Sequence, residues 1–346
     1  MSYVILIEGD DLMSFPERYH PAVSAALSSI DFGALRHVYF VACGGSLSIM
    51  HPAKFMLDQH SSLPSDVFNA AEFVARAPKR LGPDTLVVLC SMTGTTKETT
   101  AAAKFAKEKG ASTIGLTVEP ESPLGTAVDY PVKFEAPYTT GVPIDAKDSN
   151  YSAIYQIVIG IAAATGGEDL RESLIGSLYN LQAAIDRAQE TYAPLWDRYA
   201  EHFAKQDVIY TMASGASYGA AYSFAICVLM EMQWINSQAI HSNEFFHGPF
   251  EVLDETRCFV LMKGIDSTRA LDERADEFLH RFGKAENILV LDAAKLDLSG
   301  IDERFQGNVV PLIFFDTLWR FIYKVADFRQ QVMLDGRRYM KKLTDY

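Results

Sequence analysis

Cysteine is scarce in this chain of 346 residues, and so are long hydrophobic runs. The four cysteines form no C-x-x-C pair and lie within or beside apolar runs, which is typical of buried, reduced thiols in a cytoplasmic protein. No apolar run reaches about 18 residues without a polar interruption, so the sequence predicts no membrane span. The N-terminus carries no basic segment before its short apolar run, and we expect no signal peptide.

Positively charged residues are fewer than negatively charged ones. The chain has 31 lysines and arginines against 44 aspartates and glutamates, which gives a formal net charge of −13. Nonspecific binding to nucleic acid requires clustered lysine and arginine to neutralise phosphates, so we expect no nucleic-acid partner. A small phosphorylated ligand remains compatible with this charge, because backbone N–H groups and hydroxyls can bind a single phosphate locally.

Sequence motifs typical of nucleophile-, cofactor- and metal-dependent enzymes are missing. The sequence has no Rossmann fingerprint and no G-x-S-x-G elbow. No set of histidines, cysteines and carboxylates has the spacing of a metal site. We therefore expect neither a metal nor an organic cofactor.

The chain does contain a regular alternation of short apolar segments and helical patterns. The second half predicts strands at 208–212, 258–262 and 288–291. The first half predicts helices at 97–109 and 149–164, and strands at 38–42, 66–70, 86–90, 113–117 and 131–135. Strands that alternate with helices indicate parallel sheets covered on both faces.

The two halves look like copies of one unit. Residues 38–46 (VYFVACGGS) and 208–217 (VIYTMASGAS) each read as a strand that feeds a small-residue turn and a helix. A charged amphipathic stretch lies between the halves and is typical of long helices. The length suits two domains, and we expect a first domain over 1–171, linker helices over 172–206 and a second domain with a C-terminal tail over 207–346.

A loop rich in hydroxyls follows the strand at 86–90 and opens a helix. This loop, 91–96, reads SMTGTT and places Ser91, Thr93, Gly94 and Thr96 where ligands of open α/β sheets bind. Glycine allows close backbone approach, and a helix N-terminus favours an anion. The pattern predicts a phosphate-binding loop, although an ordinary helix cap has the same composition.

Two further features belong with this loop. Gly45 and Ser46 follow the first strand of the same sheet, where a ligand would also reach, and a glycine turn needed only for packing is the alternative. The corresponding loop of the second half, 263–268, lacks the hydroxyl–glycine–hydroxyl spacing. We therefore expect only the first half to hold a phosphate.

A carboxylate and an imidazole form the second candidate group. Glu231 lies at the end of a long apolar helix expected to run to Trp234, and His247 follows in a loop stiffened by Gly248 and Pro249. A carboxylate can move a proton at carbon, and an imidazole can do so at a sugar oxygen near neutral pH. Taken alone, Glu231 also fits an ordinary surface position on a helix, and His247 also fits a loop imidazole that is hydrogen-bonded to the backbone. The neighbouring His241 lies in a strand-like segment, where we expect it to pack.

These pieces together resemble the sugar isomerase (SIS) domain family, with two such domains in tandem from about Val38 onward. Residues 91–96 are similar to the family's phosphosugar loop, with Met92 where a polar residue is usual. Residues 243–249 (NEFFHGP) are similar to its G-E-x-x-H-G-P loop, with Asn243 in place of glycine. Glu231 and His247 match the family's catalytic pair and keep its separation of sixteen residues.

The resemblance implies a fold and an assembly. The fold would be two α/β domains, each with a parallel five-stranded, flavodoxin-like sheet flanked by helices. The protein would be at least a homodimer in which the loop of His247 reaches the neighbouring subunit's site.

The resemblance is strongest to the deglycases of phosphorylated Amadori compounds, and extends to the tail at 337–340. It implies hydrolysis of a 6-phosphofructosyl amino acid to glucose 6-phosphate and the free amino acid without a cofactor. Glu231 would move a proton from C1 to C2 and His247 would assist ring opening. The phosphate and sugar would be bound by Gly45, Ser46, Ser91, Thr93, Gly94 and Thr96.

Other functions stay open at this point. A phosphosugar aldose–ketose isomerase or an amino-sugar phosphate deaminase could use the same acid–base pair. A noncatalytic sugar-phosphate sensor belongs to another class and would have no reason to keep both Glu231 and His247. A structural or partner-binding module is a third alternative. The sequence does not name the amino acid released.

Overall fold

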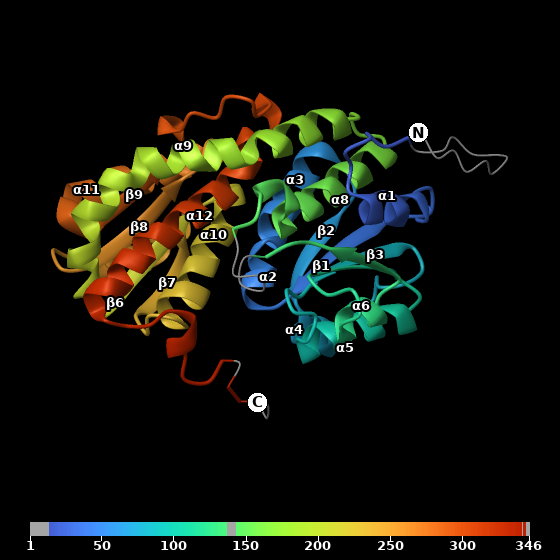
Figure 1. The fold of residues 1–346 in the computed structure, drawn as a ribbon, viewed down its shortest axis with the longest axis horizontal. Helices are drawn as coiled ribbons and strands as arrows, with labels where there is room; N and C mark the ends of the chain where they lie inside the picture. The colour runs from blue at the N-terminus through green and yellow to red at the C-terminus, as the bar shows by residue number, and fades with distance from the viewer. Residues whose placement is uncertain (1–13, 137–142, 341, 344–346) are drawn as a thin grey trace.

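The computed structural model of the protein describes residues 14–136, 143–340 and 342–343. It contains two parallel sheets that lie side by side, each covered by helices (Figure 1). The N-terminal stretch in which the sequence predicts no signal peptide lies outside the described residues. No helix in the described ranges is long and apolar enough to cross a membrane.

The first sheet has five parallel strands in the order β2-β1-β3-β4-β5. Both central strands, β1 and β3, are buried along their whole length, as expected for a parallel sheet covered on two faces. All five strands predicted from the first half are confirmed. Their bounds are β1 His37–Ala42, β2 Ser65–Asn69, β3 Thr85–Cys90, β4 Ser112–Thr117 and β5 Tyr130–Lys133.

Alternate side chains of β1 enter two different cores. Val38 and Phe40 join the large core under α3 and α8, whereas Tyr39 and Val41 pack on the opposite face against α4 and α5. The helices of this half are α1 Pro21–Ser28, α2 Gly44–Ser48, α3 Met50–His60, α4 Ala70–Arg76, α5 Lys97–Glu108, α6 Pro123–Ala127 and α8 Asn150–Ala164, with the 3₁₀ turn η1 Ala146–Asp148 before α8.

The second sheet has four parallel strands in the described residues, in the order β7-β6-β8-β9, so the fifth strand expected there is wrong. After β9 the chain enters the 27-residue helix α12, whose apolar side chains pack against α9 instead of adding a strand. Strand β7 has the polar sequence NSQAIH because it lies at the sheet edge, partly exposed. The bounds are β6 Val208–Ala213, β7 Asn236–His241, β8 Cys258–Lys263 and β9 Ile288–Asp292.

The helical segments of the second half include one π-helix. The α-helices are α10 Tyr218–Ser223, α11 Arg269–Phe282 and α12 Glu303–Arg329, and the π-helix is η3 Phe224–Met230. The 3₁₀ helices are η2 Gly215–Ser217, η4 Glu244–His247, η5 Pro249–Val252, η6 Ala285–Asn287, η7 Ala293–Lys295 and η8 Leu334–Gly336.

One long helix, α9 (Arg171–Ala204), runs along the molecule over both halves (Figure 1). It packs on α12, where the Trp196 and Phe321 rings lie 5.4 Å apart between centroids. A single hydrophobic core contains residues of both sheets and of α9. The two halves therefore form one packed body, and the division into two domains and a linker stays a prediction.

Candidate active site

The two predicted ligand loops of the first half lie next to each other. Strands β1 and β3 are paired in register, with Ala42 opposite Cys90, so the loops that follow them leave the sheet side by side. Burial raises the pKa of the Cys90 thiol to about 12, partly offset by a hydrogen bond with Ser46. Ser46 is thus placed against the end of β3, where the loop 91–96 begins.

The loop 91–96 is lined with hydroxyls, and its turn depends on a glycine. The Ser91 and Thr96 hydroxyl oxygens lie 2.9 Å apart, and those of Thr93 and Thr95 lie 2.7 Å apart. Gly94 has a φ of +67°, and a Cβ there would lie 1.8 Å from the Ser122 hydroxyl, so only glycine fits. Thr96 is the N-cap of α5, but its side chain makes no capping bond. The loop thus presents hydroxyls at a helix N-terminus, an arrangement suited to an anion.

The equivalent turn of the second half is already paired with a carboxylate of the chain. The Asp266 side chain accepts hydrogen bonds from the Ala216 N–H, at 3.3 Å, and from the Thr268 N–H, at 2.8 Å. A phosphate placed at this turn would meet the negative charge of Asp266. The geometry supports the expectation that only the first half holds a phosphate.

Glu231 follows directly after the π-helix η3. Its backbone N–H donates to the Ile226 carbonyl, five residues back, at 3.1 Å. π-Helical turns are rare and are frequently found at functional sites. The sequence predicts a helix that runs to Trp234, but the helix ends earlier and Trp234 has a φ of +55°. The π-helix was not predictable, because FAICVLM is apolar throughout and carries no periodicity that separates the two kinds of turn.

The π-helix also connects Glu231 to the loops of the first half. A Cβ on Gly45 would lie 3.7 Å from the Cys227 sulfur and 3.8 Å from the Ser223 hydroxyl, so α2 packs directly on η3. Burial and, to a smaller extent, the negative charge of Glu231 raise the pKa of the Cys227 thiol to about 12. Gly45 therefore lies next to Cys227, and Cys227 is close enough to Glu231 to be affected by its charge. These contacts connect the loops of the first sheet to the carboxylate.

The C-terminal tail covers this carboxylate. Arg337 Nη1 donates to Glu231 Oε1 at 3.0 Å, and both side chains are 19% exposed. The pair lines a hollow of about 450 Å³ formed by residues 230–231 and 234–236 of the second half and the tail at 337–340. The sequence predicts no role for Arg337; its signals are two adjacent arginines in a chain with an excess of negative charge and the resemblance of the tail at 337–340 to the deglycases.

His247 lies on the surface, beside a cluster of packed phenylalanine rings that forms an aromatic platform. It ends the 3₁₀ helix η4, and the following Gly248 has a φ of +135°. Phe245, two residues earlier, is fully buried among the rings of Phe246, Phe250 and Phe278. His247 itself is exposed, and no hydrogen bond or ion pair joins it to Glu231 in the described part of the chain. The structure of the chain therefore shows no direct bond between the two predicted catalytic residues.

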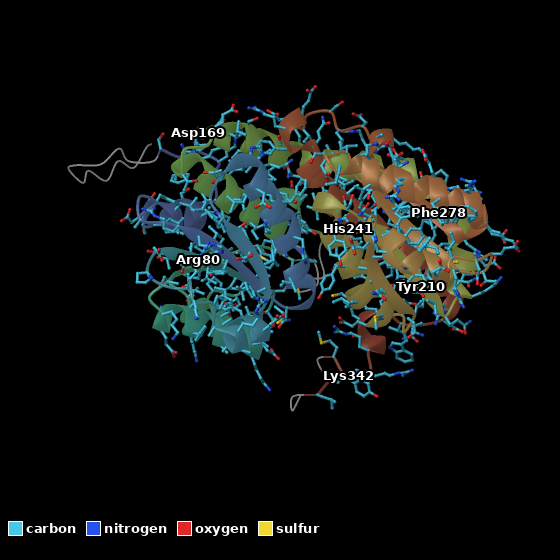
Figure 2. The ribbon with its side chains drawn as sticks, turned by 180° about the vertical axis from the view of Figure 1, so that it is seen from behind. Arg80, Asp169, Tyr210, His241, Phe278 and Lys342 are labelled. Carbon is cyan, nitrogen blue, oxygen red and sulfur yellow. The ribbon has the colours of Figure 1, made fainter. Side chains whose placement is uncertain are left out.

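His241 packs, as the sequence predicts. It is half-buried at the junction between the two halves (Figure 2), with its ring 5.9 Å from the Tyr218 ring. Its Nδ1 accepts a hydrogen bond from the Asn243 N–H at 3.2 Å. No group of three or more histidine, cysteine or carboxylate side chains that could hold a metal ion occurs among the residues that the structure describes.

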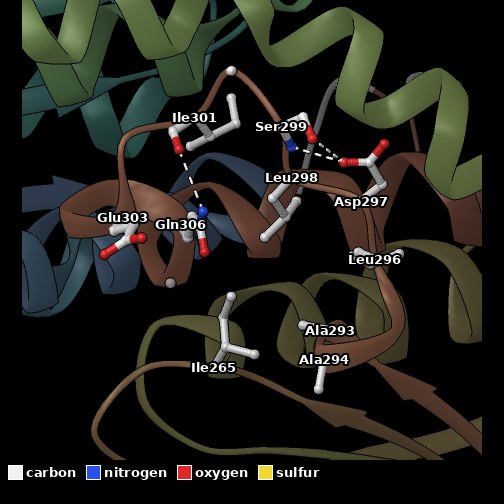
Figure 3. Close-up of a pocket in the computed structure, with 12 residues that line it drawn as sticks. Ile265, Ala293, Ala294, Leu296, Asp297, Leu298, Ser299, Ile301, Glu303 and Gln306 are labelled. Atoms are coloured by element: carbon white, nitrogen blue, oxygen red, sulfur yellow. Dashed lines mark hydrogen bonds between the residues drawn. The ribbon is translucent and has the colours of Figure 1, made fainter.

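A larger hollow, of about 570 Å³, lies beside the end of β9 and the start of α12 (Figure 3). Its polar groups include the carboxylates of Asp297 and Glu303 and the Gln306 amide, which donates to the Ile301 carbonyl at 3.3 Å. None of the described residues that line it is basic. This lining suits a phosphate poorly, and the hollow contains none of the predicted site residues.

Comparison with known proteins gives a consistent result. A SIS domain model matches residues 34–160. The fructosamine deglycase FrlB of Bacillus subtilis is 44% identical over 322 residues, covering 93% of this chain and 96% of that protein. The fructoselysine 6-phosphate deglycase of Escherichia coli is 26% identical over 330 residues, covering 94% and 92%.

Solved structures agree with the sequence comparisons. A Bacillus subtilis protein described as a phosphosugar isomerase superposes with a TM-score of 0.89 at 42% identity, over 94% of this chain and 98% of that one. A Salmonella typhimurium protein with the same description gives 0.85 at 34% identity, over 94% and 97%. This chain therefore belongs to the SIS domain family, alongside the fructosamine deglycases.

Proposed function

We propose that this protein hydrolyses a 6-phosphofructosyl amino acid to glucose 6-phosphate and the free amino acid. The observation that carries the proposal is the packing of Gly45 against the π-helix that ends at Glu231. That packing supports a shared site for the carboxylate and the hydroxyl-lined loop beside Gly45, in a chain 44% identical to a fructosamine deglycase. If the loop binds the 6-phosphate, the opposite end of the sugar would point toward Glu231.

The loop 91–96, with Gly45 and Ser46, would hold the 6-phosphate and fix the position of the reacting carbons. Orientation of this kind removes much of the entropy cost of the reaction. Backbone N–H groups at the start of α5 and the hydroxyls of Ser91, Thr93 and Thr96 supply the hydrogen bonds.

Glu231 would act as the base that moves the proton. In the open-chain substrate the amine is on C1 and the carbonyl is C2, so the C1–H is acidified by the neighbouring carbonyl. Removal of this proton gives an enaminol, and return of a proton at C2 gives an imine of glucose 6-phosphate. Water then adds to C1 and releases the amino acid. These steps need only an acid–base group and water.

His247 would protonate or deprotonate the ring oxygens as the cyclic substrate opens. Its exposure on a fixed aromatic platform supports action in the site of a second copy of the chain. We therefore propose a homodimer in which each site takes its histidine from the neighbour. The four free thiols are compatible with the reducing cytoplasm, which we propose as its location.

An assay of product release tests this function. We expect glucose 6-phosphate and free amino acid from a panel of phosphorylated Amadori compounds, and little turnover of fructose 6-phosphate or glucosamine 6-phosphate. Rapid conversion of fructose 6-phosphate would favour an aldose–ketose isomerase, and ammonia release from glucosamine 6-phosphate would favour a deaminase. Binding of these ligands without turnover of any would indicate a sensor.

Removal of the Thr96 hydroxyl is expected to weaken substrate binding. Charge-assisted hydrogen bonds contribute about 1.5–3 kcal/mol, so Thr96→Val should raise KM by about 10- to 100-fold with a smaller change in kcat. Thr191→Val is the matched control, because its hydroxyl only donates to the Arg187 carbonyl of its own helix. An unchanged KM in Thr96→Val, or equal use of unphosphorylated substrate, would contradict the assignment of this loop.

A further inference from the structure

Two consecutive arginines of the C-terminal tail lie at the proposed base. Arg337 pairs with the Glu231 carboxylate at 3.0 Å, while the Arg338 guanidinium lies over the Trp234 ring, 3.7 Å from its centroid. The Arg337 Nε also donates to the Leu334 carbonyl at 2.7 Å, which fixes the side chain in the tail. Lys342 Nζ donates to the Asp335 carbonyl at 3.1 Å, and Figure 2 shows this part of the tail beneath the two halves.

The ion pair conflicts with catalysis by Glu231. The Arg337 guanidinium occupies Oε1, one of the two carboxylate oxygens with which Glu231 could take the hydrogen from C1. A general base must accept a proton in the transition state. If Glu231 acts as the proposed function requires, Arg337 needs another anionic partner while the substrate is bound.

The proposed substrate supplies such a partner at the right place. In a sugar joined to the α-amino group of an amino acid, the carboxylate carbon lies three bonds from C1. At about 1.5 Å per bond, the carboxylate lies within about 4–5 Å of C1. Glu231 must reach the hydrogen on C1, so a guanidinium that contacts Glu231 also lies near the substrate's carboxylate.

We propose that Arg337 is a specificity-determining residue that exchanges the Glu231 carboxylate for the carboxylate of the substrate's amino acid. Its Nε stays bonded to the Leu334 carbonyl, and its Nη groups form the planar pair of donors that matches a carboxylate. Binding of a carboxylated substrate then releases Glu231 for proton transfer. The amino-acid side chain would occupy the hollow of about 450 Å³, against Met230, Trp234, Ile235 and Asn236.

A pair of substrates that differ only in this carboxylate tests the inference, which rests on the proposed function. These are 6-phosphofructosyl-glycine and 6-phosphofructosyl-methylamine. For the wild-type enzyme we expect kcat/KM to be about 10- to 100-fold higher with the glycine compound, as for one charge-assisted hydrogen-bonded pair. In Arg337→Gln this preference should disappear, while kcat/KM for the methylamine compound stays the same or rises.

Arg338→Gln is the matched control and should keep the wild-type preference, because its guanidinium stacks on Trp234 and does not contact Glu231. An equal loss with both substrates in Arg337→Gln would mean that Arg337 only positions Glu231, and this would overturn the inference. A preference kept in Arg337→Gln, or lost in Arg338→Gln instead, would overturn it too. If the wild-type enzyme released glucose 6-phosphate from neither compound, the same comparison would be made with the amino acid identified by the panel and its decarboxylated amine. No release from any compound of the panel would overturn the proposed function, and the inference with it.

Discussion

Glu231→Gln is expected to lower kcat for glucose 6-phosphate release by at least about 10²-fold, because general acid–base groups contribute about 10² to 10⁴-fold each. Glutamine has nearly the same shape and can still accept a hydrogen bond from Arg337, but its amide cannot take a proton from C1. Because glutamine can keep the hydrogen bond with Arg337, the loss of the charge should change stability little. Steady-state kinetics with a thermal unfolding curve for each variant measures both effects.

Glu190→Gln, on the exposed side of α9, provides a matched change of a carboxylate remote from the junction. It should keep wild-type turnover. If Glu231→Gln also turned over at near the wild-type rate, Glu231 would not be the base. A variant that lost activity together with its cooperative unfolding transition would indicate a folding defect, and Glu231→Asp would then be used to separate the two effects.

His247→Ala is expected to produce the second large effect, a fall in kcat of at least about 10²-fold with the fold retained. The side chain is exposed and its removal leaves the buried Phe245 platform in place. The fall in kcat should be larger with the ring-closed substrate than with the open-chain form, since the proposed role of His247 is ring opening. Wild-type turnover in this variant would exclude that role.

Mixing two inactive homodimers shows whether His247 acts across the subunit interface. One carries Ser91→Ala with Thr96→Ala, and the other carries His247→Ala. If the histidine acts in the neighbour's site, one site of a mixed dimer contains all three substitutions and the other contains none, so activity reappears. If it serves its own subunit, every site keeps a lesion and no activity returns.

Subunit exchange has to be shown independently, for instance by isolating mixed dimers through two affinity tags. Mixed dimers without activity would contradict a shared site. A protein that remained a monomer under assay conditions while fully active would contradict it as well.

The fold follows from the sequence where burial imposes a clear pattern. Strands β1, β3 and β8 are apolar at nearly every position because parallel strands are covered on both faces, and their positions are predicted within one or two residues. The edge strand β7 is polar and gives a weaker signal. The absence of a fifth strand from the second sheet of the described residues could not be predicted, because the family resemblance implies five strands, whereas the chain after β9 forms α12, which packs on α9.

The candidate site, like the fold, was predictable from the sequence only in part. The loop 91–96 and Glu231 are found from residue type and spacing, since each lies at the end of a recognisable element. Contacts between distant parts of the chain leave no such pattern. The pairing of Glu231 with Arg337, and the packing of Gly45 on Cys227, depend on how two halves and a tail fold together.

The fate of the two hydrogens on C1 tests the central claim most directly. Wild-type enzyme would be given 6-phosphofructosyl-glycine that carries deuterium at both C1 positions, and the products identified by mass spectrometry and NMR. Proton transfer from C1 followed by hydrolysis predicts free glycine and glucose 6-phosphate with a single deuterium at C1. Fructose 6-phosphate that keeps both deuterium atoms would show direct displacement of the amine and would contradict the account.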